Sequence, residues 1–301
     1  MGQQQENPIA RTHAFKKTDA AQIWGAAQKN VERVYFDEHG WAISKDNVVV
    51  PQLDGLLKLE RIPSAIFEDL VQTHKTIIHR TALTAWSGGS EEKQNRKKAY
   101  GFIDTLAQDK LTEIEFHNPY LPKQEWKTDK ESNESASVVL NKTSRDMAQA
   151  AVAGVLATIP FASLISNGYQ DLHRFGKIDE LICLQPNLQG DTICLNEHMD
   201  WPLHDGFGKI ILTIAIEESA MILLTKLQHV QGVQPSWKFR LEEGEGYILA
   251  GKTRSDFYHG IIADTLGRQS LNLRFGLHSL AEGLPIYTRW HKKGVAPPKP
   301  P

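Results

Sequence analysis

The chain shows two kinds of hydrophobic pattern, and the change between them falls near residue 180. Apolar residues at helical spacings mark segments 18–34 and 63–83, and an Ala/Val-rich helix is expected from residue 144 to Pro160. Pro63 suits the first turn of a helix, because its missing N–H is not needed there. The charged run 91–98 is interpreted as the solvated face of a further helix.

From residue 181 the pattern changes to short runs of Ile, Leu, Val and aromatic residues, separated by Gly, Pro, Asn and acidic residues. No helix-length pattern lies between the runs, which disfavours a doubly wound α/β sheet. We therefore predict an α+β protein, with a mainly helical N-terminal half and a double-stranded β-helix (jelly-roll) catalytic core. The predicted strands are 181–184, 192–195, 209–216, 220–227, 237–241, 247–249 and 271–277.

These patterns suggest four regions along the chain. Residues 1–50 form an N-terminal extension, 51–137 a helical or lid region, 138–290 the jelly-roll core and 291–301 a Pro-rich flexible tail. The lid region ends in a polar, linker-like stretch at 127–137, which has no apolar residue to anchor it.

Composition excludes some classes of protein and leaves others open. With 41% hydrophobic and 23% charged residues, the chain can form a normal packed core. Its net charge of −2 gives no global attraction to nucleic acid, so binding of a polyanion would need a local patch. Residues 96–98 and 123–130 are candidate patches, although such runs are more often a solvated helix face or loop.

The two cysteines and the N-terminus indicate a cellular compartment. Cys183 and Cys194 both lie in apolar runs, which favours buried thiols in a reducing environment over a disulfide. The first residues lack the features of a signal peptide, and no apolar run approaches membrane-spanning length. We expect a soluble intracellular protein, cytoplasmic or nuclear, with no membrane partner.

Three residues of the second half could hold a metal ion. His198 and Asp200 are two apart, so on a strand their side chains project to the same face. His259 follows three predicted strands later, in a segment that an antiparallel roll returns beside them. Two histidines and one carboxylate form the facial triad that holds Fe(II) and leaves positions open for oxygen chemistry.

Two arginines complete the pattern. Arg268 and Arg274 are six apart, so they share one face of a strand with Ser270 between them. A guanidinium clamps a carboxylate at two points, and the Ser270 hydroxyl could add another donor. Triad and arginine together predict an oxygenase that uses 2-oxoglutarate to activate O2.

Each of these residues could instead be structural when taken alone: a capping or core histidine, a turn-forming aspartate, a strand-surface arginine. A zinc pair of His198 and His204 is conceivable, but neither cysteine has the spacing of a zinc motif. The sequence also lacks a Gly-x-Ser-x-Gly elbow and a phosphate-binding P-loop. The ordered set within one β-rich region therefore favours the oxygenase over a hydrolase.

Three stretches resemble the AlkB-type family of Fe(II)/2-oxoglutarate-dependent dioxygenases. Residues 246–261 resemble the buried strand and Gly/Ser/Arg turn that lead into the family's Tyr-His-Gly-Ile. Residues 268–274 resemble its Arg-x-Asn-Leu-Thr-Phe-Arg strand, with the same arginine spacing, and 196–200 fall where it has His-x-Asp. The resemblance covers roughly residues 181–278, about a third of the chain.

The resemblance implies a role for each matching residue. His198, Asp200 and His259 would be the catalytic iron ligands. Arg268 would hold the distal carboxylate of 2-oxoglutarate with Ser270 in the family's Asn slot, and Arg274 would lie near the keto-acid end. Family members oxidise an N-methyl group on a nucleobase, or in some branches on RNA or protein, and the product breaks down to formaldehyde.

The chain also departs from the family. The Asn-x-Tyr before His-x-Asp is missing its tyrosine, and Gln185 and Asn187 are expected to contact the co-substrate in its place. The family's acidic substrate-contacting residues are replaced after Asp200, so Trp201 and His204, together with Tyr258, are the candidate substrate residues. The resemblance therefore implies the cofactor machinery more firmly than the substrate.

Three functions remain open from the sequence. The first is a demethylase whose partners are O2, 2-oxoglutarate and methylated DNA or RNA. The second is a 2-oxoglutarate oxygenase that hydroxylates a small molecule or a protein side chain, which the near-neutral charge favours. The third is a catalytically silent jelly-roll binding module, which the intact set of ligands and arginines disfavours.

Overall fold

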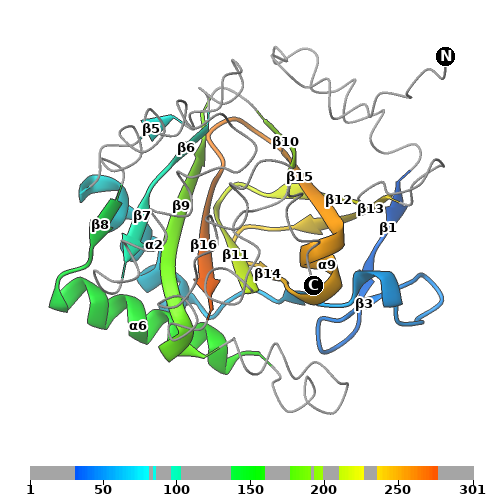
Figure 1. Cartoon of the computed structure of the whole chain (residues 1–301), viewed down its shortest axis with the longest axis horizontal. Coiled ribbons are helices and arrows are strands. Elements are labelled where there is room, and N and C mark those ends of the chain that lie inside the picture. The colour runs from blue at the N-terminus through cyan, green and yellow to red at the C-terminus, as the bar shows by residue number, and fades with distance from the viewer. Residues whose placement is uncertain are drawn as a thin grey trace, which may run out of the picture.

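The computed structural model describes residues 31–80, 84–85, 96–102, 137–159, 177–190, 193–198, 210–226 and 236–276. Two β-sheets face each other, and two long helices lie on the outer side of the larger sheet (Figure 1). The predicted tail at 291–301 and most of the predicted linker at 127–137 lie outside the described residues.

Eight consecutive strands form the two facing sheets. The order β14-β11-β16-β9 lies in the larger sheet and β13-β12-β15-β10 in the smaller one. Every neighbouring pair in these two sets is antiparallel. Strands that alternate between two sheets in this way form a jelly roll, as the sequence predicts. The strands are β9 (Leu181–Gln189), β10 (Cys194–His198), β11 (Ile210–Glu217), β12 (Ala220–Lys226), β13 (Ser236–Leu241), β14 (Gly246–Leu249), β15 (Phe257–Ala263) and β16 (Gln269–Phe275).

Short strands from the first half extend both sheets. The larger sheet gains β4 (Leu56–Leu59) beside β14, and β5 (Thr84–Ala85), β6 (Arg96–Lys98), β7 (Tyr100–Phe102) and β8 (Ser137–Val139) on the β9 side. The smaller sheet gains β1 (Glu32–Arg33), which runs parallel to β13. Strands β2 (Tyr35–Phe36) and β3 (Ala42–Ile43) form a separate hairpin, and the short helices are η1 (Pro51–Leu53), η2 (Ile178–Glu180) and α9 (Gly251–Asp256).

The prediction of a mainly helical first half is wrong for the described residues. The sequence predicts a helix over residues 18–34, but residues 32–33, near its C-terminal end, form strand β1. Residues 18–30 lie outside the described part of the chain. Residues 96–98, interpreted as a helix face, form β6 against β9. The physical reason is tertiary: the open edges of β13 and β9 pair with these segments, and that pairing overrides a weak local periodicity.

The two strongest helix predictions are confirmed. Helix α2 (Ser64–Arg80) follows Pro63, and helix α6 (Lys142–Ala157) begins where the Asn141 side chain accepts a hydrogen bond from the Ser144 N–H at 2.9 Å. The helices approach closely at Gly154, where a Cβ would lie 2.9 Å from Cδ1 of Ile66. A larger residue at position 154 would therefore have to displace the side chain of Ile66.

Most of the buried apolar residues form two layers, one on each side of the larger sheet, and a small third cluster contains Cys194, Leu223 and Ile262. One layer joins the outer face of that sheet to α2 and α6, and it includes Leu212, Leu271 and Leu273. The other fills part of the space between the sheets, with Phe239, Tyr247 and Phe257 among its members. The central strands of the larger sheet are thus buried on both faces, as β9, β11 and β16 show.

Two further expectations concern the cysteines and the membrane. Cys183 and Cys194 are both buried and neither forms a disulfide, as predicted. Within the part of the chain that the structure describes, no helix is long and apolar enough to span a membrane.

Helix α2 carries a buried histidine that should make stability depend on pH. His74 is 1% exposed, and its Nε2 has no hydrogen-bond partner among the described residues. Burial, assisted by the charge of Lys75, lowers the pKa of His74 from 6.5 to about 4. The folded state thus favours the neutral imidazole, so this stability is present above pH 6.5 and is lost as pH falls towards 4.

We expect the free energy of unfolding to fall by about 2 kcal/mol from this group alone between neutral pH and pH 5. Urea denaturation of the wild type and of His74→Leu across this range should show a flatter profile for the variant. His79→Leu, which removes an exposed histidine of the same helix, should keep the wild-type slope. If the free energy of unfolding falls equally with pH in the wild type and in His74→Leu, His74 is not the source of the pH dependence.

Candidate functional site

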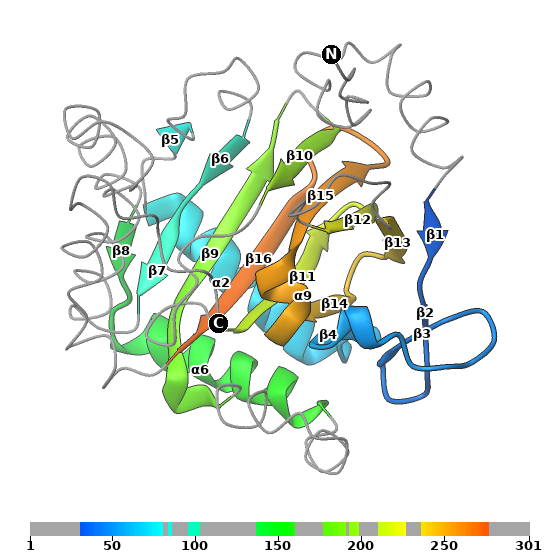
Figure 2. The same cartoon turned by 45° about the vertical axis from the view of Figure 1, so that its right-hand side comes forward.

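The space between the two sheets has a polar half, which lies along β9 and β16. The two strands are antiparallel neighbours (Figure 2), and their register pairs Ser270 with Asn187 and Asn272 with Gln185. Alternation places position 274 on the same face. The side chains on this face are polar, although all five residues are at most 6% exposed: Gln185, Asn187, Ser270, Asn272 and Arg274.

Arg268 lies at the end of this polar face, immediately before β16. It is 2% exposed, and its Nη1 donates to Oε1 of Gln189 at 3.2 Å. The two residues are also joined through the backbone, where the Gln189 N–H donates to the Arg268 carbonyl at 2.9 Å. The guanidinium of Arg268 is therefore held by Gln189, the last residue of β9, between the two sheets and away from bulk water.

A narrow cavity opens between Arg268 and the opposite sheet. It is lined from both sheets by Asn187, Gln189, Leu195, Thr213, Tyr247, His259, Ile261, Arg268, Ser270 and Asn272. Four of these residues were predicted from sequence as site residues: Asn187, His259, Arg268 and Ser270. The fold therefore brings together residues that lie up to 83 positions apart, between Asn187 and Ser270.

The two candidate histidine ligands are cross-strand neighbours. After an irregularity between Leu195 and His198, the register of β10 and β15 sets position 198 directly opposite position 259. Residues directly opposite each other share a face of the sheet, with Cβ atoms about 5 Å apart. His259 is buried and lines the cavity, and the register sets the backbone of position 198 opposite it.

Other predicted residues lie elsewhere. Gln185 does not line the cavity, because its Oε1 accepts a hydrogen bond from Arg274 Nε at 2.8 Å, further along the strands. Tyr258 is 40% exposed on the face opposite to His259, because neighbouring strand residues point to opposite sides. The structure thus does not bring Gln185, Arg274 or Tyr258 into the cavity.

The remaining predicted residues lie outside the described part of the chain. They are Asp200, Trp201 and His204. Among the described residues no group of three His, Cys, Asp or Glu side chains is placed to hold a metal ion. The whole predicted triad of His198, Asp200 and His259 therefore stays a prediction.

Sequence reasoning missed the other six residues that line the cavity, which are the apolar Leu195 and Ile261 and the polar Gln189, Thr213, Tyr247 and Asn272. The signal that could have found Asn272 is the strict alternation of polar and apolar residues from Ser270 to Phe275. Such alternation usually marks one wet face of a sheet. Here the apolar face packs against helices, so the polar face is the one that lines the interior.

Two carboxamides in this cavity retain an unused polar atom. Nε2 of Gln189 and Oδ1 of Asn272 are buried and have no hydrogen-bond partner among the described residues. A buried donor or acceptor without a partner destabilises a fold by roughly 1–3 kcal/mol. Unused buried polar atoms around a cavity are expected where a polar ligand completes the set.

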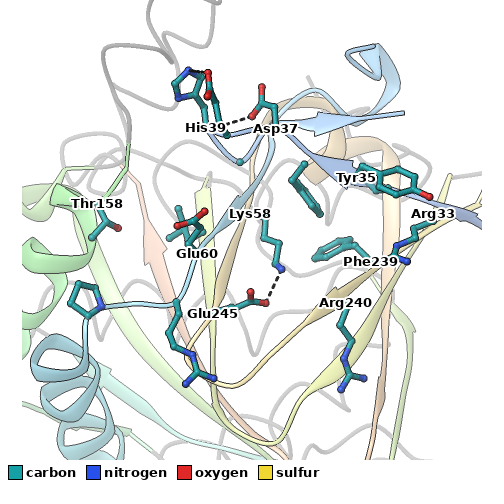
Figure 3. Close-up of a pocket in the computed structure, with 17 residues that line it drawn as sticks. Arg33, Tyr35, Asp37, His39, Lys58, Glu60, Thr158, Phe239, Arg240 and Glu245 are labelled. Atoms are coloured by element: carbon teal, nitrogen blue, oxygen red, sulfur yellow. Dashed lines mark hydrogen bonds and ion pairs between the residues drawn. The ribbon is translucent and has the colours of Figure 1, made fainter. Parts of the chain in front are cut away.

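A second pocket, of about 630 Å³, lies at the other edge of the sandwich, beside the β2–β3 hairpin (Figure 3). Lys58 Nζ there pairs with Glu245 Oε2 at 2.8 Å. Arg240, at its rim, hydrogen-bonds to Asp264 and Glu242, and the bond to Asp264 contributes most to raising the pKa of Arg240. Lys58 and Arg240 are thus paired within the protein, so their charges stabilise this edge of the fold.

Three solved structures are distantly similar to the chain. No protein-family model and no curated protein matches the chain. OsALKBH1 is 14% identical, over 73% of this chain and 97% of its own, with a TM-score of 0.44. The non-heme alpha ketoglutarate dependent epimerase SnoN from nogalamycin biosynthesis is 10% identical, over 82% of this chain and 89% of its own, with a TM-score of 0.38.

Vicilin from hazelnut (Corylus avellana) is 13% identical over 32% of this chain and 25% of its own, with a TM-score of 0.23. TM-scores this low do not by themselves establish a fold or an activity. The jelly-roll assignment therefore rests on the strand order and register described above.

The pair of Gln185 and Arg274 should act as a structural unit. Arg274→Met leaves the buried side-chain oxygen of Gln185, Oε1, without this donor. We therefore expect the free energy of unfolding to fall by about 2–3 kcal/mol. Adding Gln185→Met removes the orphaned acceptor and should restore part of the loss. Urea denaturation of the two single variants and the double variant checks this, and strictly additive losses would contradict the pairing.

Proposed function

We propose that this protein is an Fe(II)- and 2-oxoglutarate-dependent dioxygenase. The single observation that carries the proposal is the register of the jelly roll. It sets position 198 opposite His259 and places Arg268 and Ser270 on the walls of the cavity that His259 also lines. In this proposal His198 and His259, with Asp200 two residues after His198, hold the iron.

The donors in the cavity fit a carboxylate ligand. Arg268 presents a buried guanidinium, Ser270 a hydroxyl and Asn187 a carboxamide, and all three line the same space. A guanidinium forms strong, charge-assisted hydrogen bonds with a carboxylate, and burial strengthens them because little water competes. The cavity, of about 10 Å³, has room for about one water molecule, so its wall residues would have to shift for the carboxylate end of 2-oxoglutarate to enter.

The histidines suit Fe(II) for a similar reason. Neutral imidazole is a good ligand for iron, and a facial arrangement of two histidines and a carboxylate leaves positions for a chelating co-substrate. When bound, iron and 2-oxoglutarate would supply the oxidation of a substrate C–H bond by O2. The residues of the chain orient these groups and exclude water from them.

We further propose that the substrate is an N-methyl group on a nucleic-acid base, which would be released as formaldehyde. The feature that favours a polyanion is β6, whose sequence is Arg-Lys-Lys. It pairs directly with β9, so three cationic positions lie next to Asn187, Leu188 and Gln189. A basic strand beside the cavity would attract phosphate groups of the substrate.

A second candidate is an oxygenase that hydroxylates a small molecule or a protein side chain. The net charge of −2 favours it, since proteins that bind nucleic acid are commonly basic. Salt dependence separates the two candidates. Binding that weakens steeply with salt indicates contacts with several phosphates, whereas a small neutral substrate gives a shallow dependence.

We expect the protein to convert 2-oxoglutarate to succinate when supplied with Fe(II) and O2, and His198→Ala or His259→Ala to abolish this turnover. The reason is that each variant removes one of three ligands. Succinate is measured by mass spectrometry. His79→Ala, which removes an exposed histidine on α2, should turn over at the wild-type rate. Succinate formation at the wild-type rate in His198→Ala or His259→Ala would contradict the proposal.

We expect a methylated oligonucleotide to stimulate this turnover and to release formaldehyde in step with succinate. A panel of methylated and unmethylated single- and double-stranded oligonucleotides, assayed for both products, tests the substrate. Stimulation by a methylated strand but not by its unmethylated match is the expected result. A rate of succinate formation that no oligonucleotide of the panel changes would exclude the nucleic-acid substrate and favour the second candidate.

A further inference from the structure

Gln189 has an orientation that the structure fixes. Its carboxamide carries one acceptor, Oε1, and one donor group, Nε2. Arg268 can only donate hydrogen bonds, so the atom that meets its Nη1 at 3.2 Å must be Oε1. The donor half of the carboxamide is therefore the half left for the cavity that Gln189 lines.

That donor half is buried and unused. Gln189 is 2% exposed, and Nε2 has no hydrogen-bond partner among the described residues. A buried donor in this state is stabilised by an acceptor that enters the cavity. Asn187 lines the same cavity, but its Nδ2 already donates to the Gln185 carbonyl at 3.1 Å. Of these two β9 carboxamides, Gln189 is thus the one whose nitrogen forms no hydrogen bond among the described residues.

The neighbours of Gln189 favour a negatively charged acceptor. On one side it pairs with Arg268, and on the other side its cross-strand neighbour in β6 is Arg96. The buried guanidinium of Arg268 beside Gln189 raises the local positive potential at the end of β9. An anionic acceptor is therefore favoured over a neutral carbonyl at this point.

We propose that Gln189 is a further co-substrate-binding residue: Nε2 donates a hydrogen bond to the distal carboxylate of 2-oxoglutarate, while Oε1 holds the guanidinium of Arg268. This inference rests on the proposed function. It assigns to Gln189 the selection of a dicarboxylate over an oxo acid that lacks the distal carboxylate. A glutamate in its place would still accept from Arg268 but would repel the ligand.

The chemistry of the side chain provides a sharp variant. Gln189→Glu keeps the size of the side chain and the acceptor for Arg268, and replaces only the donor group with a second acceptor. We expect it to weaken binding of 2-oxoglutarate by about 10- to 100-fold or more, since a hydrogen bond to a charged group is lost and a like charge is added. Binding is measured by calorimetry without O2, on the full chain with Mn(II) in place of iron.

The ligand offers its own control. 2-Oxopentanoate has the same oxo-acid head but a methyl group where 2-oxoglutarate has the distal carboxylate. We expect the wild type and Gln189→Glu to bind 2-oxopentanoate within about threefold of each other, because the changed donor has no acceptor to meet. A loss of affinity of similar size for both ligands would overturn the specific role of Gln189.

Two further variants serve as controls for the binding measurement on Gln189→Glu. Gln269→Glu makes the same chemical change one residue after Arg268, on the outward face where Gln269 donates to Glu217, and should bind 2-oxoglutarate like the wild type. Gln189→Met removes donor and acceptor at constant size, and decides the question if the glutamate variant does not fold. If the wild type binds 2-oxoglutarate and Gln189→Glu binds it equally well, this inference alone is overturned. If the wild type binds no 2-oxoglutarate, the proposed function is overturned as well.

Discussion

The buried guanidinium of Arg268 is the constraint on which the polar half of the interior depends. Moving a charged group out of water costs on the order of several kcal/mol unless partners replace the lost hydration. Gln189 provides one partner through its side chain and fixes the backbone beside it. The strands β9 and β16 must therefore keep their register, because a slip of one residue would turn every polar side chain of this face towards the helices.

The apolar half of the interior supports this arrangement from the other side. Tyr247 lines the cavity, and its ring meets Phe239 edge to face at 5.4 Å. Phe239 in turn meets Phe36 of the N-terminal hairpin at 5.3 Å. A continuous row of aromatic rings thus leads from the cavity to the β2–β3 hairpin, so that hairpin closes the apolar edge of the sandwich rather than forming a separate unit.

Sequence patterns predicted the core well, because the β-strands from Leu181 onward alternate or run apolar in clear segments. The shared face of Ser270 and Arg274 followed from even spacing and is confirmed. The first half was predicted poorly: short strands such as β1 and β6 exist because a sheet edge is available, and no local pattern records that edge. Gln189 was missed for the same reason, since only the pairing of β9 with β16 brings it to Arg268.

The central claim is that one end of this jelly roll holds a metal and a dicarboxylate between its two sheets. A crystal structure of the protein with Mn(II) and 2-oxoglutarate tests it most directly. The account predicts the ion bound by His198, Asp200 and His259, and the distal carboxylate of 2-oxoglutarate against Arg268 and Ser270. An ion bound elsewhere, or a cavity whose arginine meets no carboxylate at saturating ligand, would contradict it.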